Sequence, residues 1–119
     1  MQEINRIQNE IEIIDNKSTP EDYKGVLKLY ENFIQDLCIK LRKILLNKHN
    51  LFISNPVFIV NYSYALDILS NKNIWIEALR LYNQVKYLIP IKDINYDMIK
   101  KMSHICNSLL ADRFFNTQD

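Results

Sequence analysis

The sequence holds a single glycine, Gly25, and three prolines among its 119 residues. Tight β-hairpin turns depend on glycine at positions of positive φ, so a chain with one glycine has few places to reverse a strand. Short connections between helices need no such residue. The composition therefore predicts an all-α protein, a small bundle whose helices are joined by short loops.

The length and charge of the chain narrow its class further. A chain of 119 residues fits one helical domain spanning residues 1–119. Hydrophobic residues make up 48% and charged residues 24%, which is typical of a globular protein. The formal net charge of +1 argues against a dedicated nucleic-acid binder, because such proteins are usually more basic.

Apolar residues recur at spacings of three and four in five segments, which predicts five helices. A stripe of isoleucines indicates the first helix. The helix-capping pair Thr19 and Pro20 marks the start of the second. Ser54 or Asn55 caps the third helix, which begins at Pro56, and Pro90 ends the fourth. The expected bounds are about 2–15, 20–48, 56–70, 74–88 and 93–115.

The expected helix over 20–48 is unusually long. At 1.5 Å per residue it spans about 43 Å, more than the roughly 30 Å width of a small domain. Either the first helix folds back along it as an antiparallel hairpin, or a second copy of the chain covers the same apolar stripe in a homodimer. Gly25 lies inside this helix, where glycine costs about 1 kcal/mol, and this predicts a close helix contact there.

Residues 59–92 combine small, aromatic and proline residues at a recognisable spacing. Ala78, Tyr82 and Pro90 follow the pattern A-x3-Y-x7-P, and Tyr62 lies in the expected helix before them. In these positions the segment resembles a tetratricopeptide repeat, a helical pair of 34 residues. The resemblance implies that Ala78 admits the paired helix closely and that Tyr82 fills the groove beside it. A shift of 34 residues in either direction gives no second copy.

The same region departs from the tetratricopeptide pattern at one place, and it also resembles a second family that suggests an RNA-binding alternative. Where the tetratricopeptide family prefers Leu then Gly in its first helix, this chain has Ala65 and Leu66. The run from Glu77 to Lys101 also resembles the pentatricopeptide family, whose helical pairs bind single-stranded RNA. Candidate phosphate contacts and stacking surfaces are Lys40, Arg42, Lys43, Lys48, Lys100 and Lys101, with Tyr62, Tyr64, Trp75 and Tyr87.

Arg42 and His49 form a second candidate pair. They resemble the Arg-x4-6-His motif of all-α ribonucleases of the HEPN type, in which Arg stabilises the phosphate charge and His moves a proton. Seven residues are two helical turns, so both side chains can share one helix face. Lys43 stands where that family usually carries a polar site residue. We therefore expect a solvated, basic helix end at this position instead.

The sequence offers no pattern that supports a metal or a nucleophile. Cys38 and Cys106 fall on apolar helix faces, where reduced and buried thiols are the rule in a reducing compartment. His104 and Cys106 lie two residues apart and point to different faces of a helix. No CxxC or HxxxH pattern occurs, and one glycine cannot build a phosphate-binding loop. We expect no catalytic residue, no metal and no cofactor.

These observations favour a non-catalytic protein–protein interaction module: an adaptor, an assembly subunit, or an inhibitor or immunity-type protein that masks a partner. The expected exposed contact residues are Trp75, Tyr64, Tyr87 and Arg42, because aromatic residues and arginine dominate interface energetics. The expected partner is another protein, with a homodimer through the 20–48 helix as a further option. Without a signal peptide or an apolar run of membrane length, we expect a soluble, cytoplasmic protein.

Overall fold

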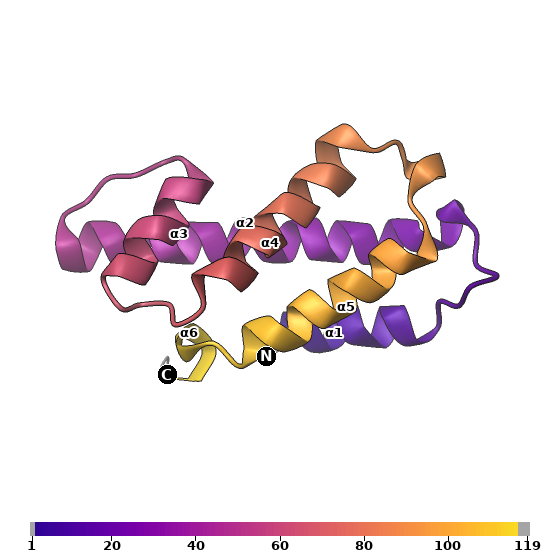
Figure 1. Ribbon diagram of the computed structural model, residues 1–119, viewed down its shortest axis with the longest axis horizontal. Helices are drawn as coiled ribbons and strands as arrows, with labels where there is room; N and C mark the ends of the chain where they lie inside the picture. The colour runs from indigo at the N-terminus through magenta and orange to yellow at the C-terminus, as the bar shows by residue number, and fades with distance from the viewer. Residues whose placement is uncertain (1, 117–119) are drawn as a thin grey trace.

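The computed structural model describes residues 2–116, and these residues form helices and no strand (Figure 1). The prediction of an all-α protein is therefore confirmed. The five longer helices are α1 (Gln2–Glu12), α2 (Pro20–His49), α3 (Pro56–Ala65), α4 (Lys72–Asn83) and α5 (Tyr96–Leu110). Three short elements complete the described chain: the π-helical turn η1 (Gln84–Leu88), the 3-10 turn η2 (Ile91–Asp93) and α6 (Arg113–Asn116).

Several helix ends differ from the expected ones, because local capping decides them. α1 ends at Glu12 rather than near residue 15. α3 ends at Ala65 rather than near residue 70, and Asp67 just beyond it has a left-handed φ of 67°. α5 begins at Tyr96 rather than at residue 93, because the Asn95 side chain accepts a hydrogen bond from the Met98 N–H at 3.0 Å. The segment expected as one helix over 93–115 is divided into α5 and α6.

α2 is the central helix against which several other helices pack. Its apolar side chains are buried from Tyr23 to Leu45, because α1, α3 and α4 all pack against it. α1 folds back antiparallel to its N-terminal half, which is the hairpin expected from the two apolar stripes (Figure 1). The molecule measures 48 × 27 × 19 Å, and its long axis runs along α2 (Figure 1).

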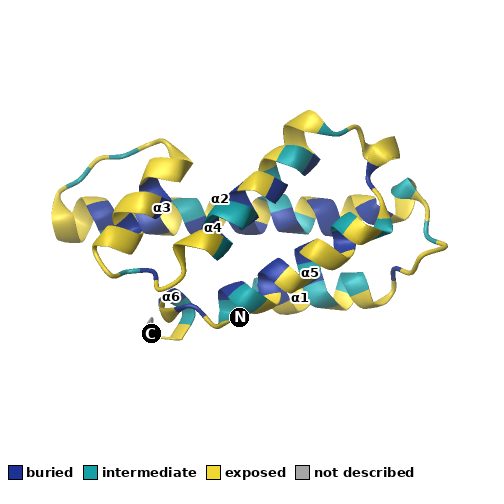
Figure 2. Ribbon diagram, viewed as in Figure 1, coloured by how far each residue is buried: buried dark blue, intermediate teal, exposed yellow. Residues whose placement is uncertain are grey.

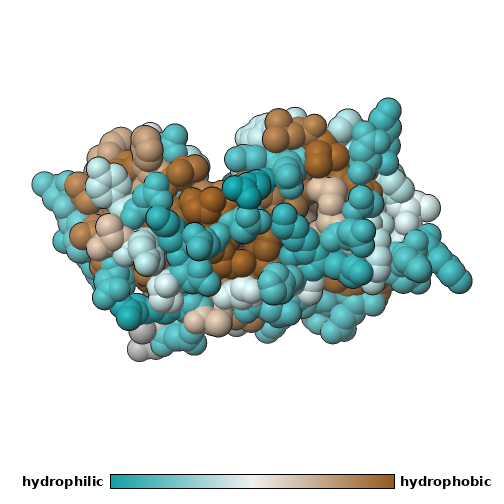
Figure 3. Space-filling view, viewed as in Figure 1, coloured by the Kyte–Doolittle hydropathy of each residue, from teal (hydrophilic) through white to brown (hydrophobic). Residues whose placement is uncertain are grey.

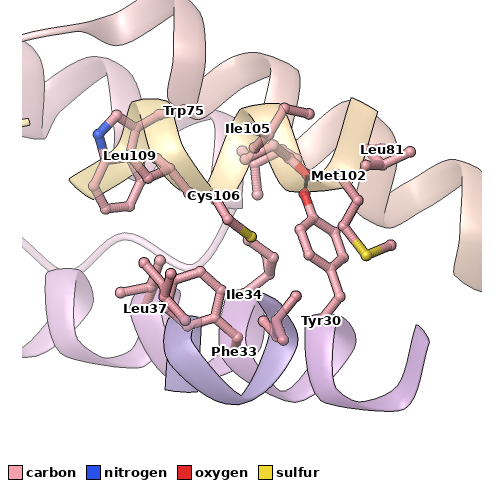
Figure 4. Packing of buried hydrophobic residues seen from close by; sticks show 14 of the residues in the cluster. Tyr30, Phe33, Ile34, Leu37, Trp75, Leu81, Met102, Ile105, Cys106 and Leu109 are labelled. Atoms are coloured by element: carbon pink, nitrogen blue, oxygen red, sulfur yellow. Dashed lines mark hydrogen bonds between the residues drawn. The ribbon is translucent and has the colours of Figure 1, made fainter. Parts of the chain in front are cut away.

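The core joins α2 to α4 and α5 (Figures 2 and 4). Tyr30 and Phe33 of α2 face Met102 and Cys106 of α5 across the interior. The hydroxyl of Tyr30 donates a 2.7 Å hydrogen bond to the carbonyl of Ala78 in α4, and burial raises the pKa of this hydroxyl well above its usual value. The hydrogen bond lets a buried hydroxyl join two helices without an unpaired donor.

Trp75 belongs to this core, so the expectation that it is an exposed contact residue is wrong. Its side chain is only 3% exposed. Its ring stacks on Phe115, with centroids 6.1 Å apart, and meets Phe114 edge-on at 5.5 Å. Both phenylalanines come from α6, which folds over α4 after a turn that the helical periodicity of the sequence does not reveal.

A buried carboxylate fastens the chain near residue 112 to the loop between α3 and α4. Asp112 is almost completely buried, and its oxygens accept hydrogen bonds from the N–H groups of Ser70 (3.1 Å), Asn71 (2.8 Å) and Phe114 (2.9 Å). These bonds hold the start of α6 beside the start of α4. They explain how the two phenylalanines reach Trp75.

Gly25 does not mark a close helix contact, contrary to expectation. The residue is exposed, and a Cβ atom placed on it would lie 3.8 Å from Oε2 of Glu10, the nearest atom outside the backbone of its own helix. That is an ordinary van der Waals distance. The glycine therefore weakens α2 without making room for a neighbouring helix.

Candidate protein-binding groove

A groove opens where α3 and α4 diverge above α2. The two helices meet at their shared loop and separate toward the opposite ends, leaving part of α2 as the floor (Figure 1). The surface is visibly hollowed between them (Figure 3). The groove has a volume of about 520 Å³. We call it the α2–α3–α4 groove; it is lined by Ile34, Gln35, Cys38, Ile39, Arg42, Asn55, Pro56, Val57, Leu79, Tyr82 and Asn83.

The lining is mostly apolar and carries one charged side chain. Ile34 and Leu79 are buried beneath the groove, whereas Ile39 and Val57 are each 44% exposed along it. The uncharged polar side chains of the lining are amides and one phenol. Arg42 is the single charged residue among the lining residues, and no carboxylate is among them.

Arg42 is held loosely. Its Nη2 donates to the Ser54 carbonyl at 3.5 Å, the outer limit of a hydrogen bond. Its Nε is buried without a hydrogen-bond partner, and no carboxylate of residues 2–116 forms an ion pair with it. A guanidinium with five donors normally finds stronger partners than this. The groove therefore contains a cation whose charge is not neutralised within the described chain.

Cys38 lies beside this cation and is half-buried. Burial raises the pKa of its thiol, and the opposing influence of the Arg42 charge is smaller. The thiol is therefore protonated at neutral pH and is a weak nucleophile. Sequence patterning predicted Cys38 in the core; the structure packs this half-buried side chain against the core, where it also lines the groove.

Tyr82 forms the α4 wall of the groove. Its hydroxyl accepts hydrogen bonds from Nε2 of Gln35 (2.8 Å) and from Nζ of Lys86 (3.0 Å). Burial alone would raise the pKa of this hydroxyl, but these bonds outweigh burial and lower it. Tyr87 packs edge-on against Tyr82, with ring centroids 6.3 Å apart, and is 67% exposed. Tyr87 therefore extends the wall outward from the groove.

The π-helical turn η1 shapes the outer part of this wall. In an uninterrupted α-helix, Leu88 would follow buried Val85 by three residues and share its face. The extra residue of the π turn, closed by the Ile89 N–H to Gln84 carbonyl bond at 2.9 Å, rotates Leu88 outward, where it is 71% exposed. Such turns occur often at functional sites.

The opposite wall belongs to a helix that is apolar on both faces. α3 buries Ile59 and Val60, yet Val57, Phe58 and Tyr62 on its other side are exposed. A helix that is hydrophobic all round is usually buried on all sides. Sequence reasoning missed Val57 and Phe58, although the absence of a polar face over this helix was a readable signal.

The four expected contact residues lie in different parts of the structure. Arg42 lines the groove, and Tyr87 extends its wall. Tyr64 is exposed on α3 but does not line the groove; the Lys72 ammonium lies 5.6 Å from its ring centroid. Trp75 is in the core, as described above.

The Arg42–His49 pair does not share this site. His49 is exposed at the last residue of α2 and does not line the groove that contains Arg42. Within the described chain, no three His, Cys, Asp or Glu side chains gather in a way that could hold a metal ion. No helix over residues 2–116 combines the length and the hydropathy needed to cross a bilayer.

Comparison with known proteins adds no relative: the chain matches no protein-family model, no curated protein and no solved structure. The tetratricopeptide resemblance of residues 59–92 therefore stays a prediction. Of its marker residues, Ala78 is buried against α2 through the Tyr30 bond, Tyr82 lines the groove, and Tyr62 is exposed.

Proposed function

We propose that this protein is a non-catalytic interaction module that binds another protein in the α2–α3–α4 groove. The proposal is supported by two adjoining apolar surfaces, the lining of the groove and the exposed side of α3. The groove itself is lined by exposed Ile39 and Val57, and Phe58 continues the apolar surface along α3. Exposed apolar patches of this kind commonly mark protein interaction sites, because burying them in a complex removes them from water.

The composition of the groove supports a protein over a nucleic acid as the partner. A nucleic-acid strand is bound by several cations that follow its phosphates, together with stacking aromatic rings. The groove lining offers one guanidinium, and its floor is aliphatic. Adaptor, assembly subunit and inhibitor roles all use this mode of binding and differ in the partner rather than in the groove.

A homodimer is an alternative use of the same surface. The apolar stripe of α2 is covered by helices of the same chain, so a dimer through α2 would have to use its exposed residues, such as Ile39 and Leu46. The experiment below includes this alternative, because a second copy would be retained like any other protein partner.

The test is an affinity capture from native cells with three versions of the chain: wild type, Ile39→Arg and Ile13→Arg. Ile39 lies in the groove, whereas Ile13 is 78% exposed and lies outside it, so the second substitution is a matched control. Each capture is divided into RNase-treated and untreated halves. We expect a stoichiometric protein that survives RNase, that Ile39→Arg loses and that Ile13→Arg keeps.

Two results would contradict the proposal. One is a protein fraction that vanishes after RNase treatment, which would indicate RNA as the direct ligand. The other is a retained protein that Ile39→Arg does not affect, which would place the interaction elsewhere. Circular dichroism of both variants shows whether each has kept the helical fold.

A further inference from the structure

We infer that the partner segment is a short amphipathic helix that carries one carboxylate beside its apolar stripe, and that this carboxylate pairs with Arg42. The inference rests on the proposed function and names the chemistry of the ligand in the same groove. It follows from the state of Arg42, from the apolar floor, and from the walls on either side.

Arg42 is a cation that residues 2–116 do not neutralise. Within these residues it lines the groove without an ion pair, its one hydrogen bond is 3.5 Å long, and its Nε has no partner. Because no strong bond fixes the side chain, an arriving carboxylate can take Nη2 and, after a small rotation, Nε as well. Arginine and carboxylate form such paired hydrogen bonds readily, and they are roughly twice as strong as neutral ones.

The surroundings of Arg42 favour one anion rather than many. No other lining residue is charged, so the groove does not match the repeated charges of a nucleic acid. The N-terminus of α3 also faces this region through Asn55, Pro56 and Val57. The positive end of that helix dipole adds to the attraction for a single carboxylate.

The floor and walls of the groove determine the shape of the rest of the ligand. Ile34, Cys38 and Ile39 of α2 form a floor along one helix face, and α3 and α4 stand on either side of it. An amphipathic helix fills such a channel by placing apolar residues at i, i+3, i+4 and i+7 along the floor. One acidic residue next to that stripe then reaches Arg42.

Cys38 supplies a reporter for occupancy of the groove. Its thiol is half-buried and lines the groove, whereas Cys106 is completely buried in the core. A maleimide added to the folded protein therefore modifies Cys38 in preference to Cys106. A ligand in the groove should slow that modification.

The experiment uses display of peptides of about 16 residues with apolar side chains at the i, i+3, i+4, i+7 spacing and all other positions free. Binders are selected on the wild-type protein. We expect Asp or Glu to be enriched at one register beside the apolar stripe. A synthetic peptide from the selection should slow maleimide modification of Cys38 and should lose binding to Ile39→Arg.

The ion pair is then tested from both sides. Replacing the enriched Glu by Gln in the peptide should weaken binding about tenfold, as should Arg42→Gln in the protein. The two changes together should weaken binding little further, because either one already removes the pair. The peptide substitution needs no change in the protein, so a failure of Arg42→Gln to fold would not prevent the test.

The outcomes separate this inference from the proposed function. One outcome is a set of peptides that protect Cys38 and do not bind Ile39→Arg, but that show no acidic enrichment and no loss of affinity when Glu is replaced by Gln. This outcome would contradict the predicted carboxylate and would still support the groove as the binding site. A selection without any groove-binding peptide would overturn the helical ligand, while the capture with Ile39→Arg decides the proposed function separately. Peptides that bind wild type and Arg42→Gln equally would also contradict the pairing.

Discussion

At the scale of single residues, three buried polar groups differ in whether they have hydrogen-bond partners, and therefore in whether they stabilise the fold. Asp112 is buried, and its carboxylate accepts several backbone N–H bonds. Oγ of Ser63 and Nε1 of Trp75 are buried without a hydrogen-bond partner. A buried polar atom without a partner contributes only its desolvation cost, so Asp112 is the group among these three that stabilises the structure.

Replacing Asp112 by Ala should therefore destabilise the protein strongly. The change removes the acceptor of three N–H groups: that of Phe114, whose bond is buried, and those of Ser70 and Asn71, whose bonds are partly buried. A fully buried donor left without an acceptor costs about 1–3 kcal/mol, and a donor that water can reach costs less. We expect a loss of about 3 kcal/mol in the free energy of unfolding measured in urea. Asp97→Ala is the control, because Asp97 is exposed and should change stability by less than about 0.5 kcal/mol. An Asp112→Ala loss as small as that of the control would contradict this role.

Cys106 makes stability depend on alkaline pH. Burial raises the pKa of its thiol from 9.0 to about 12. The unfolded chain loses this proton near pH 9, while the folded chain keeps it, so the stability is fully present below pH 9 and falls as pH rises toward 12. The slope is about 1.4 kcal/mol per pH unit in that range.

The measurement compares wild type with Cys106→Val, because Tyr30 also has a raised pKa and remains in both proteins. Between about pH 8 and pH 10, wild type should lose about 1.4 kcal/mol more unfolding free energy than Cys106→Val. Equal pH dependence of the two proteins would mean that the thiol ionises as easily in the folded state as in the unfolded one.

At the scale of elements, α2 is specified locally at both ends. The Asp22 carboxylate accepts hydrogen bonds from the Thr19 N–H (2.8 Å) and hydroxyl (3.2 Å), which ties the helix start to its cap. At the other end Asn50 adopts a left-handed φ of 55°, and the Leu51 N–H donates to the Leu45 carbonyl at 3.0 Å. Asparagine tolerates that conformation better than most residues, which explains where the helix stops.

Gly25 is the weak point inside this helix. Ala at this position has space, because the added Cβ would lie 3.8 Å from its nearest neighbour, and it restricts the unfolded chain. We expect Gly25→Ala to raise the free energy of unfolding by about 0.5–1 kcal/mol. Lys28→Ala, at an exposed position one turn further on, should change it little. A loss of stability in Gly25→Ala would show that the glycine serves a contact after all.

At the scale of the whole molecule, the length of α2 determines the shape. A compact chain of this size has a radius of gyration of about 13.5 Å. The Cα radius of gyration here is 14.8 Å, because the other helices lie along α2 instead of surrounding a spherical core. The elongated form leaves room for a groove between α3 and α4 without exposing the main core.

Small-angle X-ray scattering should show this shape at low protein concentration. We expect a radius of gyration close to the 14.8 Å of the Cα atoms, increased slightly by the hydration layer, and no dependence on concentration. The physical reason is that helices of the same chain already cover the apolar stripe of α2. A radius that grows with concentration, and that Ile39→Arg reduces again, would indicate a homodimer through the groove.

From the sequence alone, the helical class and the start of α2 at Pro20 could be predicted, and the pairing of α1 with α2 was one of two options for covering the same apolar stripe. These features depend on residues close together in the chain: a lack of glycine, apolar spacings of three and four, and capping groups within one turn. Residue type alone also made Arg42 and Tyr87 candidate contact residues; the structure places Arg42 in the groove lining and Tyr87 against Tyr82, and their role in binding stays a prediction.

Which apolar surfaces are covered depends on packing between elements that are distant in the chain, and this could not be predicted from the sequence. Periodicity says that a residue shares a face with its neighbours, but not whether another element lies over that face. Trp75 is buried because α6 folds over it, held by Asp112 to a loop about forty residues earlier. Phe58 is exposed because nothing in the described chain covers that side of α3. The groove exists because two helices diverge, and divergence is a property of packing between elements rather than of spacing along one of them.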